Sequence, residues 1–213
     1  MTHELLVGLV VFAFVSSITP GPNNLMLMAS GVNFGFRRSI PHMLGISGGF
    51  AVLLLAVGMG LGAIVHAYPG LSLAMKFASA AYLIYLAWRI AFSRSVGSGQ
   101  SGAEPLTFLQ AAMFQWVNPK AWAMALVGMG AYVNMERPWL SVVLVAIIFT
   151  LVNLPSVSVW TGFGIALRGF LANRTRLRLF NIAMGLLLVA TLWPMLRCCL
   201  LYTSPSPRDQ RGS

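Results

Sequence analysis

The sequence predicts an all-α integral membrane fold of about six transmembrane helices, arranged as two inverted three-helix repeats whose first and fourth helices are broken. Three observations predict it. Of the 213 residues, 58% are hydrophobic and only 8% are charged, whereas about a quarter of a soluble domain is charged. Long apolar runs follow one another along the chain, and polar proline motifs interrupt two of them. Such a chain must bury its surface in lipid.

Six apolar stretches are each about long enough to cross a hydrocarbon core of roughly 30 Å. They are Leu5–Met28, Leu44–Val65, Leu73–Ile90, Phe108–Val133, Leu140–Leu167 and Leu179–Leu196. The first could be mistaken for a secretory signal, but no Lys or Arg precedes it and further spans follow, so we expect it to be retained as the first helix. We expect residues 1–197 to form one transmembrane domain, with repeats at about 1–97 and 104–197.

The net charge of +10 does not indicate nucleic-acid binding, because the arginines fall singly or in short clusters between apolar runs. Most lie in or beside the first, third and fifth loops: Arg37, Arg38, Arg89, Arg94, Arg168, Arg174, Arg176 and Arg178. The positive-inside rule therefore predicts that the odd-numbered loops are cytoplasmic. Six spans would place both termini in the periplasm, and five would move the C-terminus inside.

The end of the chain changes character after Arg197. Cys198–Ser213 is rich in Ser, Pro and Arg and resembles translated adapter sequence, so we expect 198–213 to be a non-native tail and exclude it. The two cysteines are adjacent there, a spacing that makes neither a metal site nor a redox motif. We expect no metal and no cofactor.

Each half of the sequence carries one break. Thr19–Asn24 interrupts the first span, and Asn118–Lys120 interrupts the fourth. The next prolines, Pro41 and Pro138, follow at the same separation and are expected to open the second and fifth helices. An odd number of crossings per repeat would turn the second copy upside down, as in many secondary transporters.

The first break is expected to line a binding site. Pro20 and Pro22 bracket Gly21, remove backbone donors and clash with preceding carbonyls, so the helix should be two half-helices or sharply kinked. Non-helical backbone at membrane depth survives only against protein or in a solvated cavity. Asn23 and Asn24 would then begin a half-helix whose positive end suits a carboxylate. The alternative is a tightly packed proline kink without a ligand.

Lys120 is the strongest single candidate for a functional residue. A lysine within a span costs about 2.5–3.5 kcal/mol on insertion scales and normally faces a cavity or a partner. The alternative is that its side chain extends to the membrane interface. Asn153, beside Pro155, marks a second polar notch that either lines the same cavity or repairs a kink.

The spans contain no Asp or Glu, so a carboxylate proton relay is not expected. His42 is the proton-coupling candidate, because the unperturbed pKa of histidine suits the task. Its position after Pro41 also fits an ordinary role at a helix start. Gly45 with Gly49 and Gly58 with Gly62 predict close helix packing, and Trp116, Trp122 and Trp160 flank the breaks as candidate cavity walls.

Together these motifs resemble the LysE/RhtB family of amino-acid exporters, from about Leu5 to Arg197. The residues that carry the resemblance are Thr19–Asn24, Gly31, Gly35–Arg37, Ala81–Leu83 with Ala87–Trp88, and Asn118–Ala121. The Pro-Gly-Pro element is a fairly specific mark of that family, and its pairing with Asn-Pro-Lys makes chance agreement improbable.

The resemblance implies proton-motive-force-driven export of amino acids or derivatives across a bacterial inner membrane, by a protein that can work as a homodimer. It carries over a set of functional residues: Pro20, Gly21, Pro22, Asn23, Asn118, Pro119 and Lys120. Asn24 resembles the variant of cysteine and O-acetylserine exporters. Because the bundle lacks acids to balance a cationic substrate, we expect neutral amino acids such as homoserine, threonine, leucine or cysteine-like compounds.

Other classes remain as alternatives. An inorganic-ion exporter would need clustered oxygen or thiolate ligands, which the spans do not show. A membrane-embedded enzyme would need a nucleophile with its base, or a metal cluster, and His3, His42 and His66 are far apart in the sequence. The hypothesis of a non-transporting membrane subunit does not explain why two polar breaks occupy matching positions in the two halves.

Overall fold

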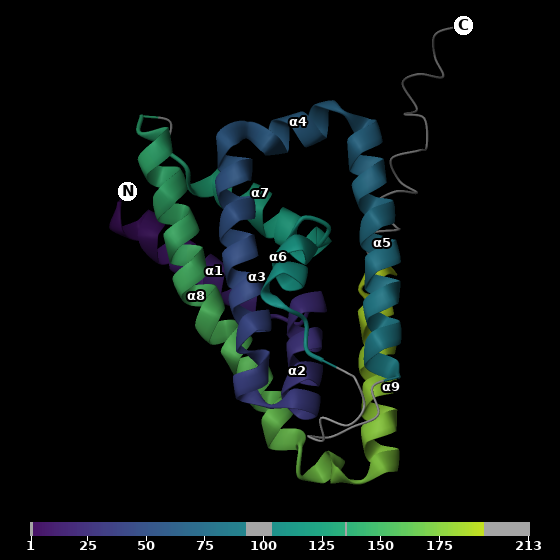
Figure 1. The fold of residues 1–213 in the computed structure, drawn as a ribbon. Helices are drawn as coiled ribbons and strands as arrows, with labels where there is room; N and C mark the ends of the chain where they lie inside the picture. Colours follow the sequence, from purple (N-terminus) through teal and green to yellow (C-terminus); the bar gives the residue numbers. More distant parts are fainter. Residues whose placement is uncertain (1, 93–103, 135, 194–213) are drawn as a thin grey trace, which may run out of the picture.

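The computed structural model describes residues 2–92, 104–134 and 136–193, and every regular element within them is a helix (Figure 1). In chain order these are α1 (His3–Ile18), α2 (Pro22–Phe34), α3 (Phe36–Ala56), the π-helical turn η1 (Val57–Leu61), α4 (Gly62–Ala67), α5 (Pro69–Ala91), α6 (Phe108–Gln115), α7 (Pro119–Tyr132), α8 (Pro138–Leu167), the 3-10 turn η2 (Phe170–Ala172) and α9 (Arg174–Ala190). The all-α prediction is confirmed. The tail 198–213 lies outside the described residues.

The predicted break in the first helix is present. α1 ends at Ile18, Thr19 is extended, and α2 begins at Pro22, with a bend of 55° between the two helices. Pro22 is the first residue of α2, where a missing N–H has no consequence because the first turn of a helix has no acceptor for it. The two prolines thus end one helix and start the next.

The second predicted break is present as well. α6 ends at Gln115, and α7 begins at Pro119 with Asn118 as its N-cap. The Asn118 side chain accepts a hydrogen bond from the backbone N–H of Lys120 at 3.1 Å, the usual way in which asparagine starts a helix. Lys120 therefore stands in the first turn of α7.

The expectation that Pro41 opens the second helix is wrong. α3 begins at Phe36, directly after Gly35, whose φ of 78° lets the chain turn out of α2 without a loop. Pro41 lies inside α3, and His42 lies in the second turn rather than at the start. Pro138 does open α8, so the equal proline spacing does not mark equivalent helix starts.

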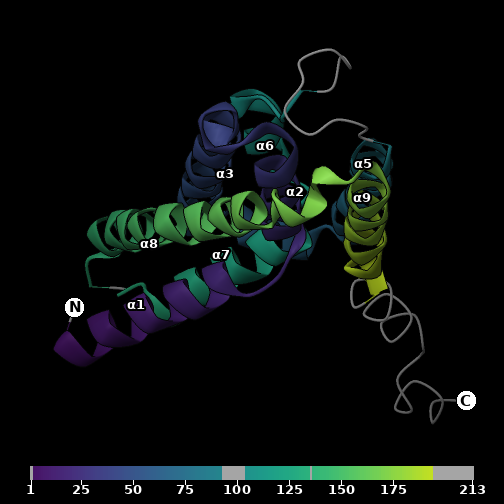
Figure 2. The same ribbon diagram turned by 90° about the horizontal axis from the view of Figure 1, so that it is seen from below.

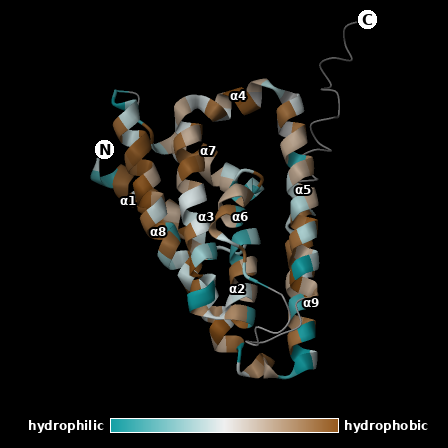
Figure 3. Ribbon diagram, viewed as in Figure 1, coloured by the Kyte–Doolittle hydropathy of each residue, from teal (hydrophilic) through white to brown (hydrophobic). Residues whose placement is uncertain are grey.

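Two helical runs are long and apolar enough to cross a membrane within the described residues: Phe36–Val65 and Pro138–Leu167, each of 30 residues. The bent pair α1–α2 passes the same test as one span. Gly60, with φ 105°, bends the chain at η1 between α3 and α4. Figure 3 shows hydrophobic residues along these helices. The count of six crossings stays a prediction.

The bundle has two flanks with short helices between them (Figures 1 and 2). α5 and α9 pack side by side on one flank, and α8 packs against α1 and α3 on the other. The half-helices α2, α6 and α7 lie between. Phe149 stands at the centre of one core cluster, with Phe12 and Phe50 edge-on at 5.8 and 5.6 Å between ring centres.

Glycines bring helix backbones into contact, as predicted for Gly45 and Gly49. A Cβ on Gly45 would overlap the Phe108 carbonyl of α6. The closest approach was not anticipated: Gly31 of α2 faces Thr161 of α8, and Gly164 faces the Met28 carbonyl, so a side chain at either glycine would overlap backbone. These contacts hold α2 firmly against α8.

The arginine-bearing helix ends gather at one end of the bundle. α2 and α8 end, and α3 and α9 begin, at the lower end of Figure 1, where α5 also ends. That end therefore carries Arg37, Arg38, Arg89, Arg168, Arg174, Arg176 and Arg178. The clustering agrees with the loop pattern of the sequence. Which side of a membrane it faces stays a prediction.

Candidate functional site

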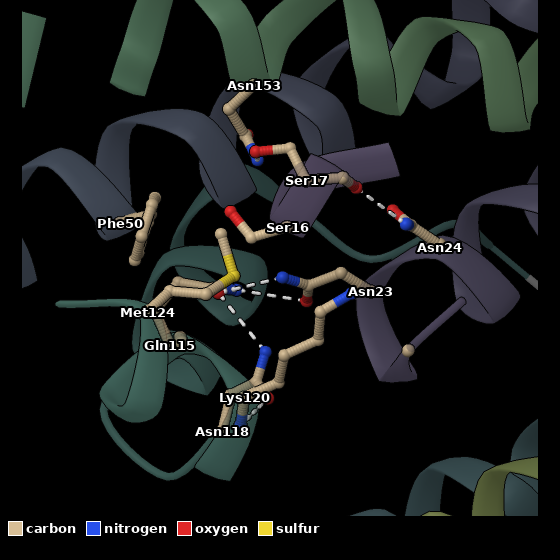
Figure 4. A pocket seen from close by; sticks show the side chains of 12 residues that line it. Ser16, Ser17, Asn23, Asn24, Phe50, Gln115, Asn118, Lys120, Met124 and Asn153 are labelled. Atoms are coloured by element: carbon tan, nitrogen blue, oxygen red, sulfur yellow. Dashed lines mark hydrogen bonds between the residues drawn. The ribbon is translucent and has the colours of Figure 1, made fainter. Parts of the chain in front are cut away.

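Both helix breaks open onto one cavity of about 340 Å³, measured with its open mouth included. Figure 4 shows its lining, which comes from α1, the first break, α2, α3, α6, α7 and α8. The residues are Ser16, Ser17, Gly21, Asn23, Asn24, Phe50, Gln115, Asn118, Lys120, Ala121, Met124 and Asn153. Among these described residues there is one charge, Lys120, and no carboxylate. The other polar groups are neutral amides and hydroxyls.

Side chains from other helices satisfy the carbonyls freed at the end of α1. Asn24 donates to the carbonyls of Ser17 and Thr19, at 2.8 Å each. The indole N–H of Trp160, on α8, donates to the Ile18 carbonyl at 2.9 Å. A helix leaves its last carbonyls without intrahelical partners, so these contacts explain how α1 can end inside the protein.

Lys120 completes this end from the other half of the chain. Its Nζ donates to the Thr19 carbonyl at 2.6 Å, lies 3.0 Å from Thr19 Oγ1, and is 3.4 Å from the Pro20 carbonyl. A Cβ on Gly21 would lie 2.7 Å from Lys120 Cδ. Gly21 has an extended backbone that any residue adopts, so the space for the lysine, rather than its φ, requires glycine there.

Asn23 and Gln115 join the two breaks with a reciprocal amide pair. Asn23 Nδ2 donates to Gln115 Oε1 at 2.8 Å, and Gln115 Nε2 donates back to Asn23 Oδ1 at 3.2 Å. Asn118 Nδ2 also approaches Gln115 Oε1 at 3.4 Å. Gln115 is fully buried, and a buried amide is stable only when its donors and acceptors are paired.

Asn153 lines the cavity from α8. Its Oδ1 accepts a hydrogen bond from Ser47 of α3 at 3.0 Å, and its Nδ2 lies 3.4 Å from Ser17 Oγ of α1. Ser156 instead bonds the Val152 carbonyl of its own helix, the usual repair next to a proline kink. The polar notch on α8 therefore combines both expected roles.

The tryptophans beside the breaks are absent from the cavity lining, which corrects the expectation that they form its walls. Trp122 donates to the Trp116 carbonyl at 2.9 Å, and Trp160 bonds α1 as described above. Ser79 of α5 donates to the Val117 carbonyl. The second break is thus held by side-chain donors like the first.

His42 does not reach the cavity lining. It is 2% exposed, and neither Nδ1 nor Nε2 has a hydrogen-bond partner in the described structure. An unpaired buried imidazole costs about 1–3 kcal/mol. The structure thus separates His42 from the residues that surround the breaks.

Several site residues were missed from the sequence: Ser16, Ser17, Thr19, Phe50, Gln115 and Met124. Gln115 had a recognisable signal, because a glutamine within an apolar run three residues before Asn118 is costly unless paired. Phe50 and Met124 had none, since a hydrophobic residue on a transmembrane helix does not reveal which way it faces.

The profile of the family described as LysE type translocator matches residues 14–192, which include both breaks and the whole cavity lining. The chain belongs to the LysE type translocators. LysE type translocators are membrane transport proteins, so this chain is a transporter and not an enzyme.

Individual relatives agree. The "Cysteine/O-acetylserine efflux protein" of Escherichia coli (strain K12) is 32% identical over 194 residues, which cover 89% of this chain and 96% of the relative. The protein of the same name from Shigella flexneri is also 32% identical over 194 residues. That of Klebsiella pneumoniae is 30% identical over 143 residues, covering 66% of this chain and 72% of the relative. No solved structure matches this LysE type translocator.

Proposed function

We propose that this chain exports small neutral amino acids of the cysteine and O-acetylserine type from the cytoplasm, across a bacterial inner membrane. The observation that carries the proposal is the single cavity into which both broken helices open. Relatives named for cysteine and O-acetylserine efflux support the substrate class. The solute binds between the ends of α1, α2 and α7.

The lining chemistry supports a zwitterionic solute with a short polar side chain. The start of α2 offers backbone N–H groups that have no intrahelical acceptor, because the first helical bond there runs from Leu25 to the Gly21 carbonyl. These groups and the Lys120 ammonium attract a carboxylate. Neutral amides such as Asn153 can bond a hydroxyl, ester or thiol. A cationic amino acid would meet the Lys120 charge without a counter-charge.

The packing supports the proposed inverted repeat. Exchanging the two halves pairs α1 with α6, α2 with α7, α3 with α8 and α5 with α9. Under this exchange the contact of α3 with α6 becomes the contact of α8 with α1, and the contacts α3–α8 and α5–α9 map onto themselves; all four contacts are extensive, whereas the close α2–α8 contact has only a small counterpart in α3–α7. We therefore propose alternating access by motion of one repeat against the other around the cavity.

Energy coupling requires a group that takes up a proton. The proton motive force drives export, and His42 takes up the proton away from the solute, because the cavity lining holds no titratable carboxylate among the described residues. The protein works as a homodimer in this proposal, and the end of the bundle that carries the arginines faces the cytoplasm.

The test is efflux from bacteria that lack their own cysteine exporters, are loaded with cysteine-containing dipeptides and carry the full chain. Thiol and O-acetylserine release should rise several-fold over an empty vector, and Lys120→Ala or Pro22→Leu should abolish the rise at unchanged membrane abundance. Lys76→Ala, which removes the other lysine on α5 outside the cavity, is the matched control and should export normally. Export of inorganic ions with no amino-acid release would overturn the proposal.

A further inference from the structure

Three oxygens at the end of α1 form a small cage around the Lys120 ammonium. They are the carbonyl and the hydroxyl of Thr19 and the carbonyl of Pro20, at 2.6, 3.0 and 3.4 Å from Nζ. An alkylammonium has three N–H donors and no acceptor, so it matches three converging oxygens. The negative end of the α1 dipole adds to the attraction.

Lys120 reaches this cage against the preference of its own helix. It stands in the first turn of α7, where the helix dipole is positive and favours an anion. Its stem crosses the break beside Gly21, where a Cβ would lie 2.7 Å from Lys120 Cδ, so the absence of a side chain at position 21 makes room for it. The oxygens that hold its charge belong to the other half of the chain.

The cage is open to an incoming molecule. Thr19 and Pro20 are exposed and Lys120 is only partly buried. The two cage residues adjoin the cavity, because Gly21, next to Pro20, and Lys120 both line it. A free amino acid carries its own ammonium group, with a carboxylate two bonds away. It can therefore offer a counter-ion to Lys120 and an ammonium to the cage at the same time.

We infer that the Thr19 and Pro20 oxygens are the subsite for the α-ammonium group of the transported amino acid, and that Lys120 occupies this subsite only while the cavity is empty. The inference rests on the proposed function. When the solute binds, its carboxylate pairs with Lys120 Nζ, and its ammonium takes the place that Lys120 leaves. One ammonium replaces another, so the oxygens never lose their partner and a zwitterion adds no net charge.

This exchange requires both charged groups of the solute. An amine without a carboxylate offers nothing to hold Lys120 outside the cage and adds a second cation to the cavity. An acid without an ammonium can pair with Lys120, although it leaves the cage empty. Removing the Lys120 charge reverses this preference, because the cage is then free for an amine while the carboxylate has lost its partner.

The test is calorimetric binding to the purified full chain of L-cysteine, cysteamine (no carboxylate) and 3-mercaptopropionate (no ammonium), under reducing conditions. The wild type should bind L-cysteine best and 3-mercaptopropionate better than cysteamine. Lys120→Ala should bind cysteamine more tightly and 3-mercaptopropionate more weakly, each by at least about tenfold. Lys76→Ala, as the control, should keep the wild-type order.

Lys120→Met serves if the alanine variant does not fold, because its unbranched side chain can keep the packing beside Gly21 without a charge or a donor that would fill the cage, and the same reversal is expected. If L-cysteine binds but either folded variant weakens the two analogues equally, or leaves their ratio unchanged, Lys120 is a structural cap and this inference fails while the proposed function stands. If the wild type binds and exports no amino acid, both fail.

Discussion

Gly21 and Lys120 share one space: a Cβ on Gly21 would lie 2.7 Å from Cδ and 3.1 Å from Nζ of Lys120. Two residues 99 positions apart (120 − 21) thus depend on each other at the point where the two helix breaks meet. The Lys120 side chain therefore explains why the Pro-Gly-Pro element has a glycine, rather than a larger residue, at position 21.

This dependence gives the first prediction. Gly21→Ala should push the Lys120 side chain out of the Thr19 cage and reduce export at least several-fold. The backbone at Gly21 is extended and tolerates alanine, so the loss comes from the lysine alone. In a Lys120→Ala background Gly21→Ala should have little further effect on unfolding in detergent, with a coupling free energy of about 1 kcal/mol or more. Additive effects would contradict the shared space.

The second prediction concerns the amide pair of Asn23 and Gln115. Asn23→Ala removes two hydrogen bonds of the fully buried Gln115, which keeps its bond to the Ala111 carbonyl and the longer one from Asn118, so the expected loss is about 0.5–1.5 kcal/mol for each lost bond. The double variant Asn23→Leu with Gln115→Leu should recover part of that stability in SDS-induced unfolding yet remain inactive in export. If Asn23→Ala unfolds like the wild type, the pair contributes nothing to holding the breaks together.

Two neighbouring glycines of α8 provide a third test. Gly164→Ala places a methyl group against the Met28 carbonyl of α2, whereas a Cβ on Gly162 meets nothing within 4 Å. Overpacking of this kind costs about 1–3 kcal/mol. Gly162→Ala should be neutral or stabilising by up to about 1 kcal/mol, because alanine favours the helix. Equal thermal stability of the two variants would show that α2 and α8 do not touch as described.

The fourth prediction separates stability from coupling at His42. His42→Leu should leave the free energy of unfolding unchanged or raise it, because it replaces an unpaired buried imidazole by an apolar side chain. Export driven by an inward proton gradient should fall, while solute counterflow without a gradient persists. His3→Leu, at the exposed start of α1, is the control. Gradient-driven export that survives in His42→Leu would exclude His42 as the proton acceptor.

Much of the fold followed from local chemistry. Pro20 with Pro22, and Asn118 with Pro119, broke their helices at the expected residues because proline lacks an N–H and asparagine caps a helix wherever they occur. Pro41 was misjudged for a tertiary reason. Gly35 lets α3 start at Phe36, five residues before Pro41 and in contact with α2, so the proline falls inside the helix.

The site divides in the same way. The sequence by itself determined the membrane class, both breaks and the polar residues on them, since composition and proline act locally. Only the tertiary structure decided that the breaks face each other, that Lys120 ends on the Thr19 oxygens, that Gln115 pairs with Asn23, and that His42 stays outside the cavity. The physical reason is that these contacts join helices far apart in the chain. Their partners are set by how α1, α2, α6 and α7 pack, which no local pattern records.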